Sequence, residues 1–485
     1  MPNMIKIQRR VLLLTPTKED NYVINRLHMG LTLLGSILTD AGHNVRVIDY
    51  AFLRSVSKYV HVSSIEETIR EFQPDVIGIS VFSYLYDECL SLIKRISTCS
   101  NSPIILGGPH FTIFPEDFSS DNRISYIVRG EAESIILDLV QSAKQEPIPV
   151  VINAPLPTPA NIPAVNLEIA YGSEYLENYQ IQLSRGCPYK CSFCNVHMIA
   201  GRKFRARDLE TVIDQIVETK KRYPRINTVT ITDDCPTFDQ KRFKHFLYLL
   251  KRANINCTLF VDNVRADSVD DESLSLYKAA GGLNMCLGVE SGDVEVFSRI
   301  HKGESLATIV EAAKKIRQHG LILGLCFVIG LPGDNFASHL NSMRLAKELR
   351  PTYIFWNMVV PWPGTEVARW YQIHGEVGEV RNFSTLIDPR VNFKEPICSS
   401  PAFSKEEMIK AWLMANMETH SYLASPENFL RLLQLTLRYR LYRSFLALLL
   451  GGFPTLLGRS FVPLSWRAAI RKRYPCLISR LHKVF

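Results

Sequence analysis

Three cysteines lie close together in residues 185–196, which read RGCPYKCSFCNV. Cys187, Cys191 and Cys194 have the spacing C-x3-C-x2-C. Thiolates are soft ligands, and three of them in one loop suit an iron–sulfur cluster. A four-iron cluster with three protein thiolates keeps one iron open for a small molecule. A zinc knuckle and three unrelated free cysteines are the alternatives, but zinc sites usually carry paired C-x2-C halves and no second half follows.

This spacing, with Phe193 directly before the third cysteine, resembles the signature of the radical S-adenosylmethionine (SAM) superfamily. The resemblance implies a 4Fe-4S cluster on Cys187, Cys191 and Cys194, with SAM bound to the open iron. One electron then cleaves SAM and produces a 5′-deoxyadenosyl radical, which removes hydrogen from an unactivated carbon. The resemblance also implies an external electron donor of the flavodoxin or ferredoxin type.

Length and composition indicate a globular protein of two or three domains. The chain has 485 residues, 46% of them hydrophobic and 21% charged,. It contains no uninterrupted run of about 18 apolar residues, which a membrane-spanning helix would need. Its eleven cysteines show no regular pairing, which fits a reducing cytosol,. We therefore expect a cytoplasmic protein.

The first domain, residues 1–145, alternates short apolar runs with amphipathic stretches. This pattern predicts a doubly wound (Rossmann-like) parallel sheet of the α/β class, whose ligands bind at the carboxyl ends of the strands. The expected strands are residues 11–14, 45–48, 76–80, 104–106 and 126–128.

Two strand ends in this domain resemble half of the cobalamin (B12)-binding pattern. Ser80 ends one predicted strand, and Gly107 and Gly108 end the next. The other half, D-x-H-x-x-G, is absent, because residues 15–21 read TPTKEDN, and Phe82 replaces the usual leucine. The resemblance implies cobalamin bound through Ser80, Gly107 and Gly108, with no histidine placed to ligate cobalt from below. A degenerate domain that keeps only the fold is the alternative.

Two histidines of this domain, His28 and His110, are candidate ligands. A lone histidine in a loop is more often a hydrogen-bonded structural residue, and we favour that interpretation for both.

Residues 146–166 are rich in proline and predict an extended linker,. A βα rhythm then runs through residues 167–370. It predicts an incomplete (β/α)6 barrel, with the cysteine loop after its first strand and active groups at the carboxyl ends of the strands. The expected strands are residues 181–183, 227–232, 258–262, 284–289, 321–329 and 353–359.

Polar residues follow several of these strands. The family resemblance implies that Asp233 or Asp234 meets the SAM amino group, and that Glu290 and Ser291 meet its ribose or carboxylate. It further implies that Gly330, in GLCFVIGLPGD, belongs to the backbone that meets adenine, and that Phe193 lies beside SAM. The alternative is that each is a turn or capping residue.

Four other cysteines lie in this domain. Cys257, Cys286 and Cys326 fall in strands and are expected in the core. Cys235 follows the acidic pair and could face the cavity.

Residues 371–485 form a basic extension that we expect to be helical. Residues 404–419 begin with a capping signature, Ser404 with Glu407. Residues 428–485 carry eleven Lys or Arg and no acid, so this segment accounts for the net charge of +8,. Its amphipathic stretch could lie on an anionic inner-membrane surface or cap the barrel. No nucleic-acid partner is expected, because no recognised binding module is present.

The order of features resembles B12-binding radical SAM proteins, in particular the branch of the anaerobic magnesium-protoporphyrin ester cyclase and the hopanoid methylases. This implies a C-methyltransferase that passes a methyl group from SAM through methylcobalamin to a hydrophobic or natural-product substrate. The alternatives are cyclisation or rearrangement without methyl transfer, and a non-catalytic sensor or electron-transfer protein. A lipophilic small-molecule substrate would suit the aromatic side chains of the sixth strand, which are equally suited to barrel packing: Tyr353, Phe355, Trp356 and Trp362.

Overall fold

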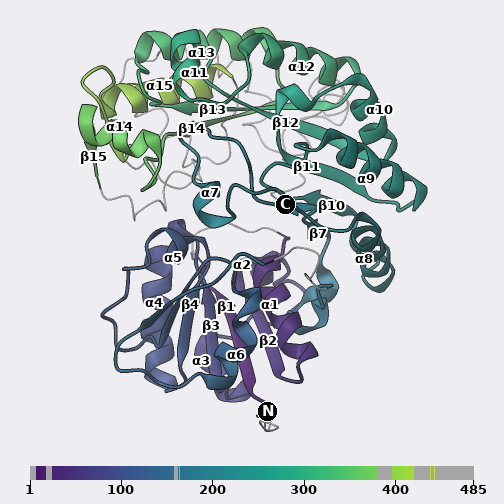
Figure 1. Ribbon diagram of the computed structural model, residues 1–485, viewed down its shortest axis with the longest axis vertical. Coiled ribbons are helices and arrows are strands. Elements are labelled where there is room, and N and C mark those ends of the chain that lie inside the picture. Colours follow the sequence, from purple (N-terminus) through teal and green to yellow (C-terminus); the bar gives the residue numbers. More distant parts are fainter. Residues whose placement is uncertain are drawn as a thin grey trace.

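The computed structural model describes residues 7–17, 25–157, 162, 164–378 and 396–419, together with Leu437 and Tyr442. Two α/β units face each other, and the carboxyl ends of the first sheet's strands point toward the second unit (Figure 1). The predicted C-terminal tail from residue 420 onward, with its membrane-surface alternative, lies outside the described residues apart from Leu437 and Tyr442.

The first unit is a six-stranded, all-parallel sheet of order β2-β1-β3-β4-β5-β6. Its apolar runs are buried on both faces, as strands covered by helices require,. The strands are β1 (Arg10–Thr15), β2 (Asn44–Asp49), β3 (Val76–Ser80), β4 (Ile104–Gly107), β5 (Tyr126–Arg129) and β6 (Val150–Asn153). The helices are α1 (Met29–Asp40), α2 (Tyr50–Ser55), α3 (Ile65–Phe72), α4 (Tyr86–Cys99), α5 (Pro109–Ile113) and α6 (Ile136–Ser142). The doubly wound fold is confirmed.

The predicted linker needs a correction, because part of it belongs to this sheet. Residues Val150–Asn153 pair with β5 in parallel register, from Tyr126 against Val150 to Arg129 against Asn153. The prolines on either side concealed a four-residue strand. A short edge strand of this kind carries little sequence signal.

The second unit is a partial barrel of six parallel strands, with β7 and β14 at its two edges. Its strands are β7 (Asn178–Ile181), β10 (Thr228–Ile231), β11 (Thr258–Val264), β12 (Gly282–Glu290), β13 (Ile322–Ile329) and β14 (Tyr353–Met358). Its helices are α8 (Leu209–Arg222), α9 (Gln240–Arg252), α10 (Asp271–Ala279), α11 (Val294–Arg299), α12 (Leu306–Gln318), α13 (Phe336–Leu349), α14 (Glu366–His374) and α15 (Lys405–Glu418). Five short elements of the described residues are α7 (Val196–Ile199), the paired strands β8 (Ser184–Arg185) and β9 (Arg205–Ala206), β15 (Glu376–Val377) and β16 (Cys398–Ser399). The six predicted βα units are therefore present.

Alternation along β12 decides which side chains face the lumen. Met285, Leu287 and Val289 are at most 2% exposed and pack toward the helices. Their neighbours Cys286 and Glu290 consequently point to the opposite face, because successive side chains of a strand alternate. The same rule sends Cys326 of β13 and Tyr353 and Phe355 of β14 into the lumen.

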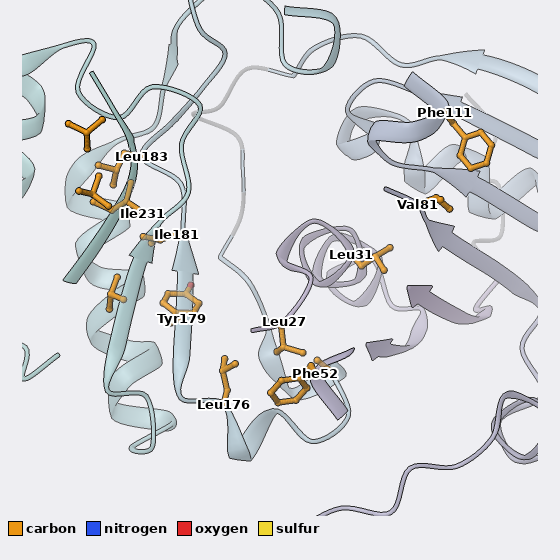
Figure 2. Packing of buried hydrophobic residues seen from close by; sticks show 14 of the residues in the cluster. Leu27, Leu31, Phe52, Val81, Phe111, Leu176, Tyr179, Ile181, Leu183 and Ile231 are labelled. Atoms are coloured by element: carbon orange, nitrogen blue, oxygen red, sulfur yellow. The ribbon is translucent and has the colours of Figure 1, made fainter. Parts of the chain in front are cut away.

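A single hydrophobic core runs through both units. Figure 2 shows Leu27 and Phe52 of the first unit beside Leu176, from which the buried side chains continue through Tyr179 and Ile181 of β7. The first strand of the barrel is thus fixed against the first domain.

The predicted helix of residues 404–419 is α15, and its capping box of Ser404 and Glu407 is present. It packs on the barrel wall, where Trp412 Nε1 donates to the Trp356 carbonyl oxygen at 2.9 Å. Trp356 itself stacks on Phe327, so this aromatic residue serves packing. Among the described helices, none has the length and apolar character needed to cross a bilayer.

Candidate cofactor and active site

The cysteine loop follows β7 and is fixed by backbone hydrogen bonds. The Cys187 N–H donates to the Gly201 carbonyl at 3.2 Å, and the Ser192 N–H donates to the Ile300 carbonyl at 2.9 Å. Gly186 has φ +83°, and a Cβ there would collide with the Lys203 carbonyl oxygen. The loop can therefore take this path only with glycine at residue 186.

We predict that Gly186→Ala prevents cluster assembly. An alanine adds the left-handed backbone cost of about 1–2 kcal/mol and also displaces the backbone carbonyls of Ala200, Gly201 and Lys203. Gly42→Ala is the matched control, because Gly42 has φ +93° but nothing within 4 Å of the added Cβ. Iron and sulfide content after reconstitution is the measurement. Equal cluster loading in the two variants would contradict the prediction.

The three thiols of the loop are free and half-buried. A hydrogen bond from the Cys235 thiol lowers the pKa of Cys187 to about 7. Burial raises the pKa of Cys194 to about 12. Within the described residues, no three His, Cys, Asp or Glu side chains converge on one metal position. A four-iron cluster needs no such convergence, because each of its three protein thiolates binds a different iron.

Cys235 is 2% exposed and lies against the first cluster cysteine. It therefore does not face an open cavity.

The acidic pair after β10 holds the cysteine loop in place. Asp233 is fully buried, and its two oxygens accept from the Leu183 N–H at 2.7 Å and the Ser184 hydroxyl at 2.5 Å. Asp234 is partly exposed and accepts from the Gly186 N–H through Oδ2 at 2.9 Å. Asp233 thus anchors the loop through both oxygens, whereas Asp234 keeps an oxygen for a ligand; the SAM contact expected of one of them stays a prediction. Neither residue caps the next helix, because Asp239 does so.

Burial raises the pKa of Asp233 from 3.8 to about 7. Between these values the unfolded chain has lost this proton while the folded chain keeps it, so stability falls as pH rises. In the cluster-free protein, Asp233 should make the free energy of unfolding fall by about 1.4 kcal/mol for each pH unit between pH 4 and pH 7. We predict that Asp233→Asn removes this pH dependence. Urea unfolding at several pH values measures it. An unchanged slope would show that Asp233 is ionised in the fold.

A buried group of charges lies beside the cysteine loop at the end of β12. Glu290 has φ +63° and pairs through Oε1 with Lys302 Nζ at 3.0 Å, and Lys302 also pairs with Glu304 at 3.3 Å. Burial lowers the pKa of Lys302, but Glu290 and Glu304 outweigh it, and the pKa is raised overall. Lys302 therefore stays charged close to Cys191.

Arg265 is the second cation that sequence reasoning missed. Its guanidinium lies 3.5 Å from the ring centroid of Tyr189, inside the cysteine loop, and bonds to Asp267 and to the Lys302 carbonyl. Two buried cations next to three thiols suit a site that must hold a negatively charged cluster. The signal in the sequence was weak, because Arg265 follows β11 and Lys302 lies between α11 and α12, in loops with no motif of their own.

Two other predicted SAM residues are used structurally. Ser291 is 2% exposed, and its hydroxyl accepts from the Asp293 N–H at 3.1 Å. The Gly330 N–H donates to Asp334 at 2.8 Å, and its carbonyl accepts from the Tyr371 hydroxyl. Ser291 and Gly330 therefore have structural hydrogen bonds, and their contact with SAM stays a prediction. Glu290, Asp234 and the half-buried Phe193 remain candidates.

The predicted cobalamin residues meet at the carboxyl ends of the neighbouring strands β3 and β4, which form the carboxyl edge of the first sheet. Ser80 and Gly107 are paired in the β3–β4 register, and Gly108 packs so closely on Ser80 that an added Cβ would lie 2.7 Å from the serine oxygen. A Cβ on Gly107 would meet nothing nearer than 3.8 Å, so the strand end is open there. The sheet order reverses between β1 and β3, which is where such folds bind ligands. The residues present fit a bound cofactor at this edge.

His28 lies beside Ser80 at the carboxyl end of β3. Its Nδ1 accepts from the Leu31 N–H at 3.1 Å, so the proton lies on Nε2, which donates to Ser80 Oγ at 3.1 Å. Burial lowers the pKa of His28 and keeps it neutral. Both nitrogens are occupied, as expected for a structural histidine.

His110 is also structural. Its ring nitrogens are 3.1 Å from Ser83 Oγ and 3.1 Å from Asp117 Oδ2, and the residue is fully buried.

A buried ion network joins the first domain to the cysteine loop. Glu131, directly after β5, accepts from Arg185 Nη1 at 2.7 Å and from Arg205 Nη1 at 3.0 Å, and Glu133 accepts from Arg185 at 2.6 Å. The Glu131, Arg185 and Arg205 side chains are only 7–12% exposed. Arg185 comes two residues before Cys187, so the cobalamin-side edge and the cluster loop are held together.

Apolar contacts reinforce this junction. Ile113 and Phe114, at the end of α5, pack with Met198 and Ile199 of α7 and with Trp362. Trp362 therefore belongs to the domain interface.

The lumen wall carries a thiol pair that we had expected in the core. Cys286 Sγ and Cys326 Sγ are 3.4 Å apart on neighbouring strands, and both residues are partly exposed. Beside them, Asn284 donates to the Tyr353 hydroxyl at 2.7 Å, and the Phe355 ring is 48% exposed. The core prediction for Cys286 and Cys326 is wrong, because these positions alternate toward the lumen.

Solved structures share this arrangement of domains. TsrM, a radical SAM methyltransferase from Kitasatospora setae, superposes with a TM-score of 0.63 at 17% identity, covering 87% of this chain and 90% of its own. OxsB, a cobalamin-dependent SAM radical enzyme, gives a TM-score of 0.63 at 18% identity, covering 91% of this chain and 72% of its own. At these identities the likeness concerns the fold.

Sequence relatives point in the same direction. The anaerobic magnesium-protoporphyrin IX monomethyl ester cyclase of Cereibacter sphaeroides is 25% identical over 74% of this chain and 62% of its own length. This chain thus spans less than two thirds of that cyclase. The hopanoid C-3 methylase of Methylococcus capsulatus is 24% identical over 70% of this chain and 67% of its own length.

Two family profiles match the chain in the order of its two units. The B12 binding domain matches residues 27–140, and the radical SAM superfamily matches residues 181–346, which include the cysteine loop. The cofactors that go with these domains are a 4Fe-4S cluster, SAM and cobalamin, and the residues described above fit them. The chain therefore contains a B12 binding domain followed by a domain of the radical SAM superfamily.

Proposed function

We propose that this enzyme transfers a methyl group to an unactivated carbon of a small, lipophilic substrate. When bound, the cluster with SAM supplies a hydrogen-abstracting radical, and cobalamin supplies the methyl group. The observation that carries the proposal is the set of hydrogen bonds from Arg185 and Arg205 to Glu131. These bonds hold the end of the first sheet that carries Ser80 and Gly108 against the unit that carries the cysteine loop. A substrate between them would meet both cofactors.

We assign the remaining roles by position. The thiolates of Cys187, Cys191 and Cys194 hold the cluster, and Asp234 and Glu290 orient SAM from the strand ends beside it. Lys302 holds the Glu290 side chain in place through their contact at 3.0 Å. Tyr353 and Phe355 offer aromatic surface to an apolar substrate,, and closure by the first domain excludes water from the radical.

The lumen thiols favour a second candidate function. A carbon radical that receives no methyl group takes a hydrogen atom readily from an S–H group, and Cys286 and Cys326 present two of them 3.4 Å apart. A cyclisation or rearrangement that ends by hydrogen return would use them. We therefore retain this alternative, whereas the intact cysteine triad disfavours a non-catalytic sensor.

One experiment separates the candidates. Reconstituted enzyme is incubated with methyl-deuterated SAM, a flavodoxin reductant and substrates of the named relatives, namely magnesium-protoporphyrin ester, hopanoids and tryptophan. Labelled methyl in the product, with both 5′-deoxyadenosine and S-adenosylhomocysteine formed, supports methyl transfer. 5′-Deoxyadenosine without S-adenosylhomocysteine supports the second candidate. Absence of both products with every substrate contradicts the proposal.

A further inference from the structure

A compact group of basic and aromatic side chains surrounds the outer side of the cysteine loop. We call it the basic–aromatic patch and define it by Tyr189, Lys190, Arg202, Lys203, Phe204 and Phe238. We propose that this patch docks an acidic, one-electron carrier protein of the flavodoxin or ferredoxin class. The inference rests on the cluster of the proposed function and adds the surface through which its electron arrives.

The patch is contiguous with the cluster loop. Arg202 Nη1 donates to the Tyr189 carbonyl oxygen at 2.9 Å. The Phe238 ring centroid lies 5.8 Å from that of Tyr189 and 5.1 Å from that of Phe204. Backbone carbonyl oxygens of residues 200–203 lie close to Gly186, which is next to the first cluster cysteine. A partner seated here would be separated from the cluster by little more than this loop.

The charge of the patch fits an acidic partner. Lys190, Arg202 and Lys203 are exposed, and within the described part of the chain none of them takes part in an ion pair. The nearby acids are committed elsewhere, since Asp239 caps α9 and Asp267 binds Arg265. Unpaired surface cations raise the association rate of an oppositely charged protein through long-range attraction.

The apolar part of the patch suits a short-lived complex. Phe238 is 42% exposed and lies between the two other rings. Electron-transfer complexes have small interfaces and low affinity, so a few exposed aromatic side chains surrounded by charged residues suffice for contact. In the transfer step, the reduced carrier loses one electron and the oxidised cluster gains it; no bond or proton needs to move.

The test uses the cluster-loaded full chain and a recombinant acidic flavodoxin in its fully reduced form. Stopped-flow absorbance follows cluster reduction, and calorimetry measures binding of the oxidised flavodoxin. Lys190→Glu with Lys203→Glu should slow reduction by about tenfold or more at low ionic strength. The difference should largely vanish in about 1 M salt, where the Debye length is about 3 Å.

Two controls separate docking from other effects. Lys221→Glu with Lys251→Glu makes the same charge change on exposed residues of α8 and α9, at the helix ends far from the cysteine loop, and should leave the rate unchanged. Photoreduced 5-deazariboflavin, a small reductant, should reduce the clusters of all variants alike. Equal flavodoxin rates and affinities in the two double variants would overturn the docking site. Failure to cleave SAM despite normal cluster reduction would instead count against the proposed function.

Discussion

Cys191→Ala is expected to abolish SAM cleavage completely. Cys191 is the middle thiol of the C-x3-C-x2-C loop and lies within reach of the positive charges of Lys302 and Arg265. Two thiolates from this loop cannot hold a four-iron cluster with a defined open iron. The reduced variant should show no iron–sulfur signal in electron paramagnetic resonance and no 5′-deoxyadenosine by chromatography.

Two cysteines of this chain provide controls for that variant. Cys99→Ala makes the same chemical change at an exposed position of α4 and should keep full activity. Cys235→Ala removes the buried thiol that contacts Cys187 without removing a loop ligand, and should keep the cluster. SAM cleavage that persists in Cys191→Ala would refute the radical mechanism.

Glu131→Gln is expected to loosen the junction between the two cofactor regions. The change leaves the size of the side chain but removes the charge that Arg185 and Arg205 share in a nearly dry environment. Removing one partner from a buried ion network costs about 3–5 kcal/mol. Urea unfolding of the full-length protein should show a loss of this order.

The same variant should uncouple the two cofactors. In the unaltered protein, loading the cluster should change the affinity for cobalamin, because Arg185 precedes the cysteine loop and Glu131 follows the strand beside Gly107,. In Glu131→Gln this difference should shrink, as measured by fluorescence titration of cobalamin with and without cluster. Glu133→Gln is the matched control, since Arg185 is the one cation that Glu133 contacts among the described residues. An equal effect of both variants would argue against a special role for Glu131.

Local sequence patterns were sufficient for the fold class and the cluster. The three cysteines lie within eight consecutive residues, so their spacing defines a shared site before any tertiary contact forms. The strand expected at residues 76–80 is β3 with the same bounds, and the helix expected at residues 404–419 is α15 with its capping box, because the apolar spacing and capping residues that determine strands and helices are close in sequence,. The parallel sheets follow from buried apolar runs that alternate with those helices.

Tertiary structure alone decided which polar residues remain available to a ligand. Asp233 was a SAM candidate by position, but its oxygens are taken by Leu183 and Ser184, about fifty residues earlier in the chain. The Gly330 carbonyl oxygen accepts from the distant Tyr371 hydroxyl in the same way. Conversely, the ion pair of Lys302 with Glu290 and that of Arg205 with Glu131 join residues that are far apart in sequence, so no local pattern predicts them. Spacing along the chain determined which cofactor this protein holds, whereas strand alternation and long-range pairing determined which side chains face it.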